Sequence, residues 1–340
     1  MSSELEAASR EIEVALPLVE QLAHEMQRRI VGQPVLIERL LIGLVTGGHV
    51  LLEGVPGLAK TLAARTLAEA VGLGFGRVQF TPDLLPSDLL GTLVYDRRTG
   101  QFVPHYGPIF TNILLADEIN RAPAKVQSAL LESMQERRVT IGDTTYRLPE
   151  PFLVLATQNP IEHEGTYALP EAQIDRFMLK VLITYPDRSS EREMLDLLLG
   201  VGPEVTGDAG NADAIRITPV IDAAGVALCR RAAHAVYADD RIRDYVLRLV
   251  EATRPSAATR IESIREHVRY GASPRATLYL TLAAKAHAFL RHRPYVVPED
   301  VKSIAPDVLR HRIVLTYEAE ADEITPDDVV RKVLDKVAVP

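Results

Sequence analysis

The sequence has 340 residues, more than one hydrophobic core usually holds, so roughly one to three domains are expected. Its net charge of −8 argues against a basic surface that coats nucleic acid, and its 47% hydrophobic content is ordinary for a globular protein. The single cysteine, Cys229, excludes an intrachain disulfide, and no apolar run approaches the roughly 18 residues of a membrane span.

The N-terminal segment, residues 1–30, is expected to form a helix and not a targeting signal. It is acidic, and Leu16, Val19 and Leu22 recur at helical spacing on one side. Glutamates stand where a signal peptide has basic and then apolar residues, so we expect a cytoplasmic protein.

Residues 31–186 have the pattern of an α/β domain with a parallel sheet. Short apolar runs alternate here with helical stretches, which is typical of a doubly wound fold with five strands. The expected strands are His49–Glu53, Arg77–Phe80, Ile113–Ala116, Phe152–Thr157 and Phe177–Ile183.

Two β-hairpins are expected as additions to this domain. Residues 93–95 and 101–103 flank a turn that contains Thr99 and Gly100. Residues 138–141 and 146–148 flank the turn 142–144, which begins with Gly142.

The remaining chain is expected to form a linker or insertion, 187–220, and a smaller helical domain, 221–340. The stretch 200–219 is rich in Gly, Pro, Asp and Ala and is the candidate flexible part. Beyond residue 221 the apolar positions recur at helical spacing. Cys229 lies in a run of Ala, Val and Leu, so we expect it to be buried.

The stretch 49–61, HVLLEGVPGLAKT, reads as a strand, a glycine-rich turn and the start of a helix. It matches the phosphate-binding motif G-x-x-x-x-G-K-[ST] except that Ala59 replaces the second glycine. We expect Ala59 to have helical dihedral angles, at which alanine costs nothing. Lys60 would reach the β- and γ-phosphates of ATP, and the Thr61 hydroxyl would bind Mg²⁺. The expected nucleotide-binding residues of the loop are Gly54, Val55, Pro56, Gly57, Leu58, Ala59, Lys60, Thr61 and Leu62.

Acidic and amide side chains follow two of the expected strands. The apolar run 113–116 ends in Asp117 and Glu118, and the run 152–157 is followed by Asn159. Because ligands bind at the carboxyl ends of parallel strands, we expect Asp117 to hold the Mg²⁺ shell and Glu118 to polarise a water. Asn159 would hydrogen-bond that water and the γ-phosphate, whereas the plain alternative is an Asn-Pro turn.

Two arginines stand at informative positions, Arg176 just before the fifth expected strand and Arg275 at the start of a helix. From position alone, each also fits an ordinary surface arginine. Their pairing with the loop and the acidic residues rests on the resemblance that follows.

From about residue 30 to residue 313 the chain resembles the MoxR family of AAA+ ATPases. Five blocks in the family's order carry the resemblance: GVPGLAKT (54–61), QFTPDLLPSDLLG (79–91), ATQNPIEHEGTYALPEAQIDRF (156–177), GASPRA (271–276) and APDVLRHRI (305–313). The alanine at position 59 is also found in this family, whereas residues 200–250 match it poorly.

The resemblance implies a role for each candidate residue. Lys60 and Thr61 match Walker A, Asp117 and Glu118 match Walker B, Asn159 falls at sensor 1, Arg275 at sensor 2 and Arg176 at the arginine finger, while Gly32 and Gln33 belong to the segment that lines the adenine pocket. Sensor 2 would act from the lid on nucleotide in the same subunit. The arginine finger would reach into the site of a neighbouring subunit, so the resemblance implies a ring, most simply a hexamer.

The family fold is an αβα core with a five-stranded parallel sheet, followed by an all-helical lid. The family's activity is Mg-dependent ATP hydrolysis coupled to chaperone-like maturation of protein partners, often proteins with von Willebrand factor A domains. Three alternatives stay open at this point: an ATPase subunit of a magnesium-chelatase-like complex, a DNA-acting motor or transcription activator, and a scaffold that binds nucleotide without turnover. The acidic balance and the lack of a recognisable DNA-binding motif argue against nucleic acid.

Overall fold

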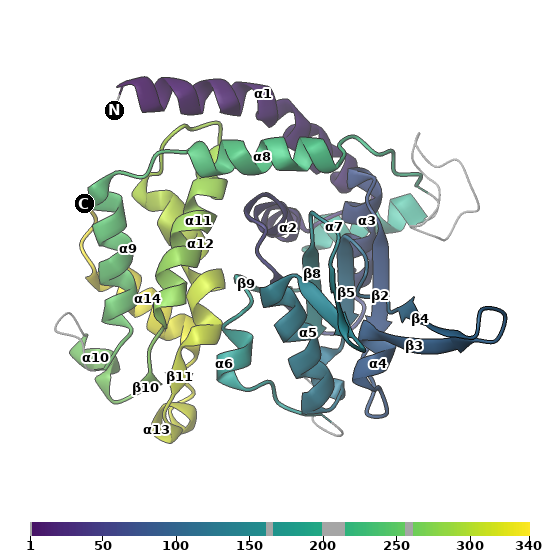
Figure 1. The fold of residues 1–340 in the computed structure, drawn as a ribbon. Helices are drawn as coiled ribbons and strands as arrows, with labels where there is room; N and C mark the ends of the chain where they lie inside the picture. The colour runs from purple at the N-terminus through teal and green to yellow at the C-terminus, as the bar shows by residue number, and fades with distance from the viewer. Residues whose placement is uncertain (1, 161–165, 199–214, 256–260) are drawn as a thin grey trace.

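The computed structural model describes residues 2–160, 166–198, 215–255 and 261–340 (Figure 1). An α/β core and a second, mainly helical body lie side by side. Two helices, α1 (Ser2–Gln27) and α8 (Ala223–Ala235), run along one side of both bodies. The expected N-terminal helix is therefore confirmed, and it packs across the junction of the two bodies.

The core is built on a five-stranded parallel sheet, as predicted. Its strands are β1 (Val50–Glu53), β2 (Phe75–Gln79), β5 (Ile113–Asp117), β8 (Leu153–Gln158) and β9 (Leu179–Leu182), in the order β2-β5-β8-β1-β9. All four neighbouring pairs are parallel. β5 is buried along its whole length, which explains why its sequence is a continuous apolar run and not an alternating one.

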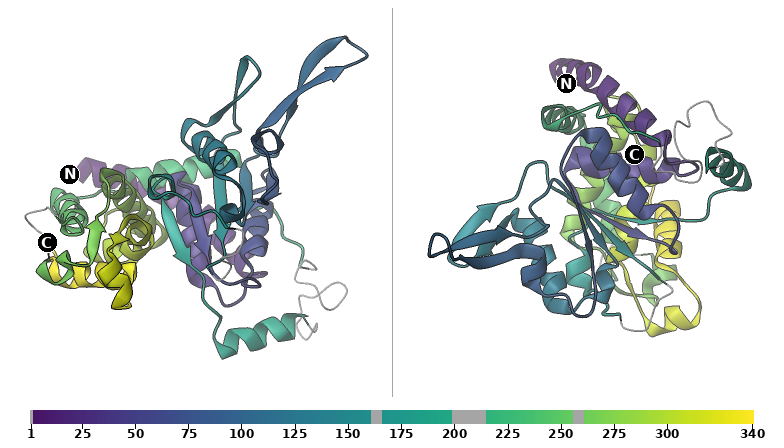
Figure 2. Two further views of the ribbon diagram at one scale, coloured as in Figure 1. Left: turned by 90° about the horizontal axis from the view of Figure 1, so that it is seen from below. Right: turned by 90° about the vertical axis from the view of Figure 1, so that its right-hand side faces the viewer.

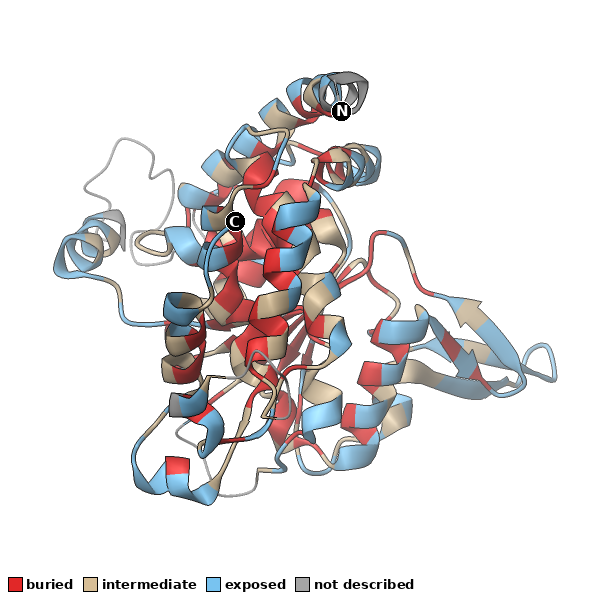
Figure 3. Ribbon diagram, turned by 90° about the vertical axis from the view of Figure 1, so that its left-hand side faces the viewer, coloured by how far each residue is buried: buried red, intermediate tan, exposed pale blue. Residues whose placement is uncertain are grey.

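Alternate residues of the strands feed two separate hydrophobic clusters, one on each face of the sheet. Leu115 and Leu155 pack with α2 (Pro34–Thr46), α3 (Lys60–Val71) and α8. Leu114 and Val154 pack on the other face with α5 (Ala124–Glu136). Figure 3 shows the buried residues concentrated where helices meet the sheet. The short helices of the core are α4 (Pro86–Leu90), the 3-10 turn η1 (Ile119–Arg121) and α6 (Glu171–Ile174).

Both predicted hairpins are present. They consist of β3 (Gly91–Asp96) with β4 (Gln101–Tyr106), and of β6 (Arg138–Ile141) with β7 (Thr144–Arg147). The turn of the second hairpin contains Gly142 at φ 60°, a left-handed conformation that favours glycine. Figure 2 shows both hairpins projecting from the core in the same general direction, away from the helical body.

The helical body contains six α-helices and, in addition, a small sheet among the residues that the structure describes after position 236. The helices are α9 (Asp240–Ala252), α10 (Glu262–Arg265), α11 (Pro274–Leu290), α12 (Pro298–Leu309), α13 (Tyr317–Ala321) and α14 (Pro326–Lys336), with the 3-10 turn η3 (Arg310–Arg312). The sheet pairs β10 (Val268–Tyr270) with β11 (Val314–Leu315) in antiparallel fashion. The helical lid is thus confirmed, but the expectation that it is all-helical is wrong. The two strands are too short to show a periodic pattern that distinguishes them from loops.

The segment 187–220, expected as a linker or insertion, includes a helix and a packed return. The helix is α7 (Arg188–Leu198), and residues 199–214, which hold most of the candidate flexible stretch, lie outside the described residues. Ile215 and Ile217 are buried, and the Val220 amide donates a hydrogen bond of 2.9 Å to the Ala70 carbonyl. The chain therefore re-enters the core against α3 before it reaches α8.

Cys229 is buried on α8, as expected, where its thiol faces the Ala15 carbonyl at 3.7 Å. Burial raises the pKa of this thiol to about 11. Cys229 is therefore a small apolar packing residue of the α1–α8 contact and carries no thiolate at neutral pH.

His49, immediately before β1, is a buried histidine with both ring nitrogens engaged. Its Nδ1 accepts a hydrogen bond of 2.9 Å from the Val154 amide, so the proton resides on Nε2, which donates to the Met134 carbonyl at 3.2 Å. Burial, with further contributions from the nearby charges of Arg137 and Arg230, lowers the pKa of His49 from 6.5 to about 4. The folded protein thus holds this ring neutral.

This arrangement predicts a specific acid sensitivity. In the unfolded chain His49 becomes protonated below about pH 6.5, whereas in the folded chain it stays neutral until about pH 4. Because the unfolded state binds more protons in this window, the free energy of unfolding falls as the pH drops through it. At pH 5 the expected loss is about 2 kcal/mol relative to pH 7. Urea unfolding at both pH values checks it, with His49→Gln as the control because a glutamine does not titrate. An equal loss in the wild-type and variant proteins would contradict the assignment.

Candidate active site

The glycine-rich loop lies at the carboxyl end of β1, between that strand and α3. A Cβ atom on Gly54 would lie 2.7 Å from the Ile183 carbonyl oxygen, so no side chain fits at this position. Gly57 has φ +85°, and a Cβ there would meet nothing within 4 Å. The loop is therefore closed on the side of β9 and open on the side of Gly57, where backbone amides can face an anion.

The conformation of Ala59 differs from the expectation. It has φ 55° and ψ 20°, the left-handed region, and not the helical dihedral angles expected from the sequence. The chain must turn left-handed here to enter α3, and its carbonyl then accepts the hydrogen bond of the Ala63 amide at 2.8 Å. An alanine in this region costs roughly 1–2 kcal/mol, which a glycine would not. The prediction of a cost-free alanine is therefore wrong.

Lys60 and Thr61 open α3 directly after this turn. The Lys60 ammonium donates a hydrogen bond to the Gly54 carbonyl, so the side chain folds back over the loop. The N-terminus of a helix of 12 residues adds partial positive charge at the same place. Amides, ammonium and helix end are together the groups that can bind an anion, and Thr61 is the second residue of the same helix.

Asp117 ends β5 and is held by two neighbouring strands. One carboxylate oxygen accepts a hydrogen bond of 2.6 Å from the Thr157 hydroxyl of β8, and the other accepts from the Arg77 guanidinium of β2 at 2.6 Å and 3.1 Å. The Thr157 hydroxyl also accepts a hydrogen bond of 2.8 Å from the Glu118 amide. Thr157 therefore fixes both acidic residues. Sequence reasoning missed both partners of Asp117. Thr157 stands at the end of an expected strand, which was an available signal, whereas Arg77 lies in the middle of β2 and gave none.

Glu118 follows with φ 56°, which turns its side chain at the strand end. Its carboxylate accepts hydrogen bonds from the Gln79 amide at 2.6 Å and from the Arg121 guanidinium at 2.9 Å. Gln79 ends β2, so it was also within reach of reasoning from strand ends. Asn159, just past the end of β8, is buried at the same edge. The structure thus brings the acidic pair and Asn159 to the sheet edge from which the phosphate loop starts.

A cavity of about 380 Å³ adjoins the phosphate loop on the side away from β5, the strand that ends at the acidic pair Asp117 and Glu118. Gln33 lines it, and its amide donates a hydrogen bond of 3.0 Å to the Thr184 carbonyl. Gly32, with φ +73°, admits no side chain because a Cβ would lie 2.5 Å from the Ser190 Cβ. The cavity is lined by Val31, Gln33, Pro56, Gly57, Leu58, Ala59, Tyr185, Pro186, Glu191, Met194 and Leu195.

This mainly apolar lining suits the faces of a nucleotide base. Tyr185, Met194 and Leu195 are additions that sequence reasoning missed, because α7 was taken for part of a linker. The apolar residues of α7 at helical spacing were the available signal.

Arg176 and Arg275 lie at the opposite edge of the sheet. Both line a cavity of about 290 Å³ with Gly48 and His49, which precede β1, whereas the phosphate loop follows β1. The four residues of β1 separate the two edges by about 13 Å of strand. The Arg275 guanidinium is paired at 3.0 Å with Asp175, next to Arg176. The expectation that Arg275 acts on nucleotide in its own subunit is therefore wrong for this structure.

The loop that carries Arg176 is clamped by a buried arginine, Arg312. Its guanidinium is paired with the Asp175 carboxylate at 2.7 Å and donates to the Phe177 carbonyl at 2.6 Å. The Ser273 hydroxyl also donates to Asp175, at 3.1 Å. Asp175 therefore ties the start of the lid helix α11 and the turn η3 to the base of Arg176.

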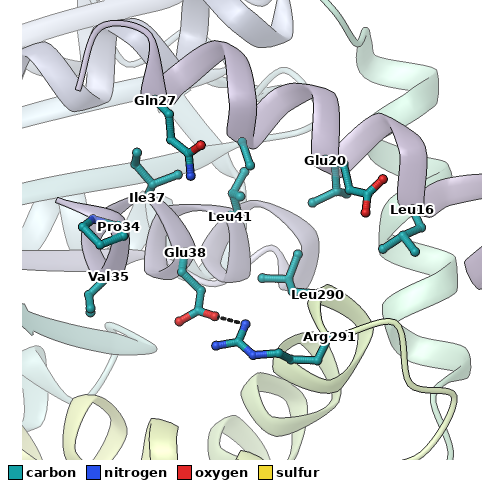
Figure 4. Close-up of a pocket in the computed structure, with 12 residues that line it drawn as sticks. Leu16, Glu20, Gln27, Pro34, Val35, Ile37, Glu38, Leu41, Leu290 and Arg291 are labelled. Carbon is teal, nitrogen blue, oxygen red and sulfur yellow. Dashed lines mark hydrogen bonds and ion pairs between the residues drawn. The ribbon is translucent and has the colours of Figure 1, made fainter. Parts of the chain in front are cut away.

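A further cavity of about 380 Å³ lies between α1, α2 and α11 (Figure 4). Leu16, Ile37 and Leu41 give it an apolar lining, and Glu38 and Arg291 form an ion pair at its rim. It contains neither the phosphate loop nor the acidic pair, so it is separate from the candidate active site.

Within the described residues, no group of three or more His, Cys, Asp and Glu side chains could hold a metal by itself. The oxygen donors expected to bind the metal are the Thr61 hydroxyl and the Asp117 carboxylate. Such a sparse set of hard oxygen donors fits Mg²⁺, which keeps water and phosphate oxygens as most of its ligands. No described helix is both long and apolar enough to cross a membrane.

Comparisons with known proteins match these features. The ATPase family associated with various cellular activities (AAA) matches residues 49–179, and the AAA lid domain matches residues 260–333. Chaperone MoxR1 of Mycobacterium tuberculosis is 50% identical over 322 residues, covering 95% of this chain and 82% of the relative. Protein MoxR of Methylorubrum extorquens is 34% identical, with 93% of each chain covered. The crystal structure of a protein from Cytophaga hutchinsonii superposes with a TM-score of 0.88 at 48% identity, and the match covers 99% of both chains.

Proposed function

This chain belongs to the MoxR family of AAA+ ATPases, and from that premise we propose that it couples Mg-dependent ATP hydrolysis in a ring, most simply a hexamer, to chaperone-like remodelling of a protein partner. As a member of the family it is an ATP-hydrolysing P-loop enzyme with a MoxR-type core and lid. The ring, the metal and the partner are the proposed parts.

One observation supports the proposal most strongly, namely the convergence of the phosphate loop, Asp117, Glu118 and Asn159 at one sheet edge. In this proposal the loop amides and Lys60 bind the triphosphate, and Gln33 and the apolar residues around it enclose the base. Thr61 and Asp117 would hold Mg²⁺, which neutralises phosphate charge when it is bound. Glu118 would accept a proton from the attacking water, and Asn159 would orient that water.

The side chains that now contact Asp117 and Glu118 would have to exchange for Mg²⁺ and water when nucleotide binds. Arg77 occupies one carboxylate oxygen of Asp117 at 2.6 Å, and Gln79 and Arg121 occupy the Glu118 carboxylate. Arg77 is half exposed and can move aside into solvent, whereas the Thr157 hydroxyl on the other oxygen of Asp117 is buried. Thr157 is thus suited to hold Asp117 and Glu118 in place while Arg77, Gln79 and Arg121 give way to the bound nucleotide.

The ring is supported by the positions of the two arginines. A subunit holds nucleotide at the carboxyl edge of its sheet, whereas Arg176 and Arg275 stand at the amino edge. In a head-to-tail ring the amino edge of one subunit faces the carboxyl edge of the next, so each site would be completed by its neighbour. We therefore propose that Arg275, like Arg176, acts on the nucleotide of the neighbouring subunit.

The partner is proposed to be a protein, with a von Willebrand factor A-domain protein as the candidate that the family suggests. The hairpin β3–β4 projects from the core and exposes large apolar side chains on both strands, among them Tyr95, Phe102 and Tyr106. Exposed apolar groups of this kind suit contact with protein surfaces. The name of the relative Chaperone MoxR1 supports the chaperone-like part.

The alternatives have less support. A magnesium-chelatase-like subunit would share the hairpins, but the relatives of highest identity reported above carry MoxR names. A DNA-acting motor is disfavoured by the net charge of −8.

The dependence of ATPase rate on protein concentration tests the ring. The rate per subunit is expected to rise steeply with concentration and to level off when rings are complete, because isolated subunits lack the neighbour's arginines. Phosphate release and light scattering, measured in parallel from dilute to concentrated protein, check both quantities. A flat rate per subunit down to monomers would refute the proposal.

A further inference from the structure

The cavity at the amino edge of the sheet contains a third arginine that has no role so far. Arg137 lines it together with Arg176 and Arg275. It directly follows the last residue of α5, with φ 52°, and its guanidinium donates a hydrogen bond of 3.4 Å to the Gly47 carbonyl. The end of α5 thus places this side chain at the cavity that Arg176 lines from the loop before β9 and Arg275 lines from the start of α11.

The charges in this cavity are not balanced. Arg275 is paired with Asp175, whereas neither Arg137 nor Arg176 has a carboxylate partner within the part of the chain that the structure describes. Arg230 lies close by, since a Cβ on Gly47 would be 3.3 Å from the Arg137 guanidinium and 3.4 Å from that of Arg230. A buried nitrogen of Arg230 has no hydrogen-bond partner among the described residues.

Convergent guanidinium groups repel one another, and the repulsion is larger where burial reduces the screening by water. Burial, and then the charge of Arg137, lower the pKa of Arg230, although Glu150 opposes this. An anion with several oxygen atoms would relieve the repulsion and satisfy several guanidinium groups at once. Within the described ranges no carboxylate pairs with Arg137, so an anion supplied from outside the subunit fits this position.

We propose that Arg137 is a third phosphate-binding arginine, which each subunit supplies with Arg176 and Arg275 to the ATP held by its neighbour. The inference rests on the proposed ring and adds a residue to its shared site. The triphosphate is the fitting ligand because it carries high charge density at the face that Arg176 is expected to enter.

Mixed rings test the proposal. The Arg137→Gln subunit keeps its phosphate loop, and the Lys60→Ala subunit keeps its arginines. Each alone is expected to hydrolyse ATP at least about 10²-fold more slowly than wild type. Rings assembled from both variants can be purified through two different tags. They should hydrolyse ATP at roughly a quarter of the wild-type rate, because about one interface in four joins an intact phosphate loop to the three intact arginines.

The matched control is Arg138→Gln, which removes the same charge at the next position, where the guanidinium is exposed and paired with Glu136 at 2.8 Å. It is expected to keep the wild-type rate. Glutamine at position 137 has the same backbone cost as arginine at φ 52°, so ATP binding and the melting temperature of Arg137→Gln should stay near those of wild type.

Two results would overturn the inference while the proposed function stands. One is wild-type activity of Arg137→Gln alone. The other concerns mixed rings with Lys60→Ala subunits. If ATP hydrolysis recovered when these were mixed with Arg176→Gln but not when they were mixed with Arg137→Gln, Arg137 would not act across the interface. A wild-type protein without ATPase activity at any concentration would overturn both the inference and the proposed function.

Discussion

The Arg176→Ala protein is expected to bind ATP as tightly as wild type and to hydrolyse it about 10³- to 10⁵-fold more slowly. The phosphate loop and the base cavity of the same subunit are remote from this side chain, since Arg176 lies at the opposite edge of the sheet. The lost charge would instead be missing from the transition state in the neighbouring site, where an arginine stabilises the transferring phosphoryl group.

Single-turnover phosphate release at saturating ATP measures this effect separately from binding. Arg241→Ala is a suitable control, because that guanidinium is 79% exposed on α9 and pairs only with nearby Asp239 among the described residues. A wild-type rate for Arg176→Ala, with rings intact, would remove Arg176 from the mechanism. A loss of ATP binding would instead show that the arginine supports its own subunit's fold.

The Glu118→Gln protein is expected to bind ATP normally and to hydrolyse it about 10²- to 10⁴-fold more slowly, because the amide has the same shape but cannot accept the proton of the attacking water. The Gln79 amide that donates to Glu118 at 2.6 Å can still donate to the amide oxygen of the variant, so the local structure should persist. The trapped ATP state should also hold a partner protein longest.

Equilibrium binding of labelled ATP and phosphate release under the same conditions check this prediction. Glu136→Gln is the control, since its carboxylate is exposed, lies at the end of α5 and pairs with Arg138. Equal activity of Glu118→Gln and wild type would exclude Glu118 as the base.

The sheet and the placement of Asp117, Glu118 and Asn159 at its carboxyl edge were predictable because both depend on local signals. Buried parallel strands need continuous apolar runs, and β5 and β8 have them directly before Asp117 and before Asn159. The strand-turn-helix sequence around Lys60 gave the phosphate loop. The family resemblance added names for these residues and is confirmed by the relatives at 50% and 34% identity.

The rest depended on contacts between segments far apart in the sequence. Arg77 and Thr157 act on Asp117 only because β2 and β8 flank β5, an order that no single segment encodes. The left-handed Ala59 results from the angle at which the loop must enter α3, and alanine gives no sign of it.

The place of Arg275 was missed for the same reason. Position in the chain shows that it begins a helix, but not which edge of the sheet that helix reaches. Arg275 is held at the amino edge by its ion pair with Asp175, which Arg312 also contacts. These residues are far apart in the sequence, and helix propensity and hydrophobic periodicity describe only neighbouring residues.

The central claim is that backbone amides and the Lys60 ammonium gather Mg-ATP beside the acidic pair, and equilibrium titration of the purified protein with a fluorescent ATP analogue tests it most directly. The account predicts saturable binding that weakens when Mg²⁺ is chelated and is lost in Lys60→Ala. The absence of binding by wild type in both dilute and fully assembled protein would contradict it.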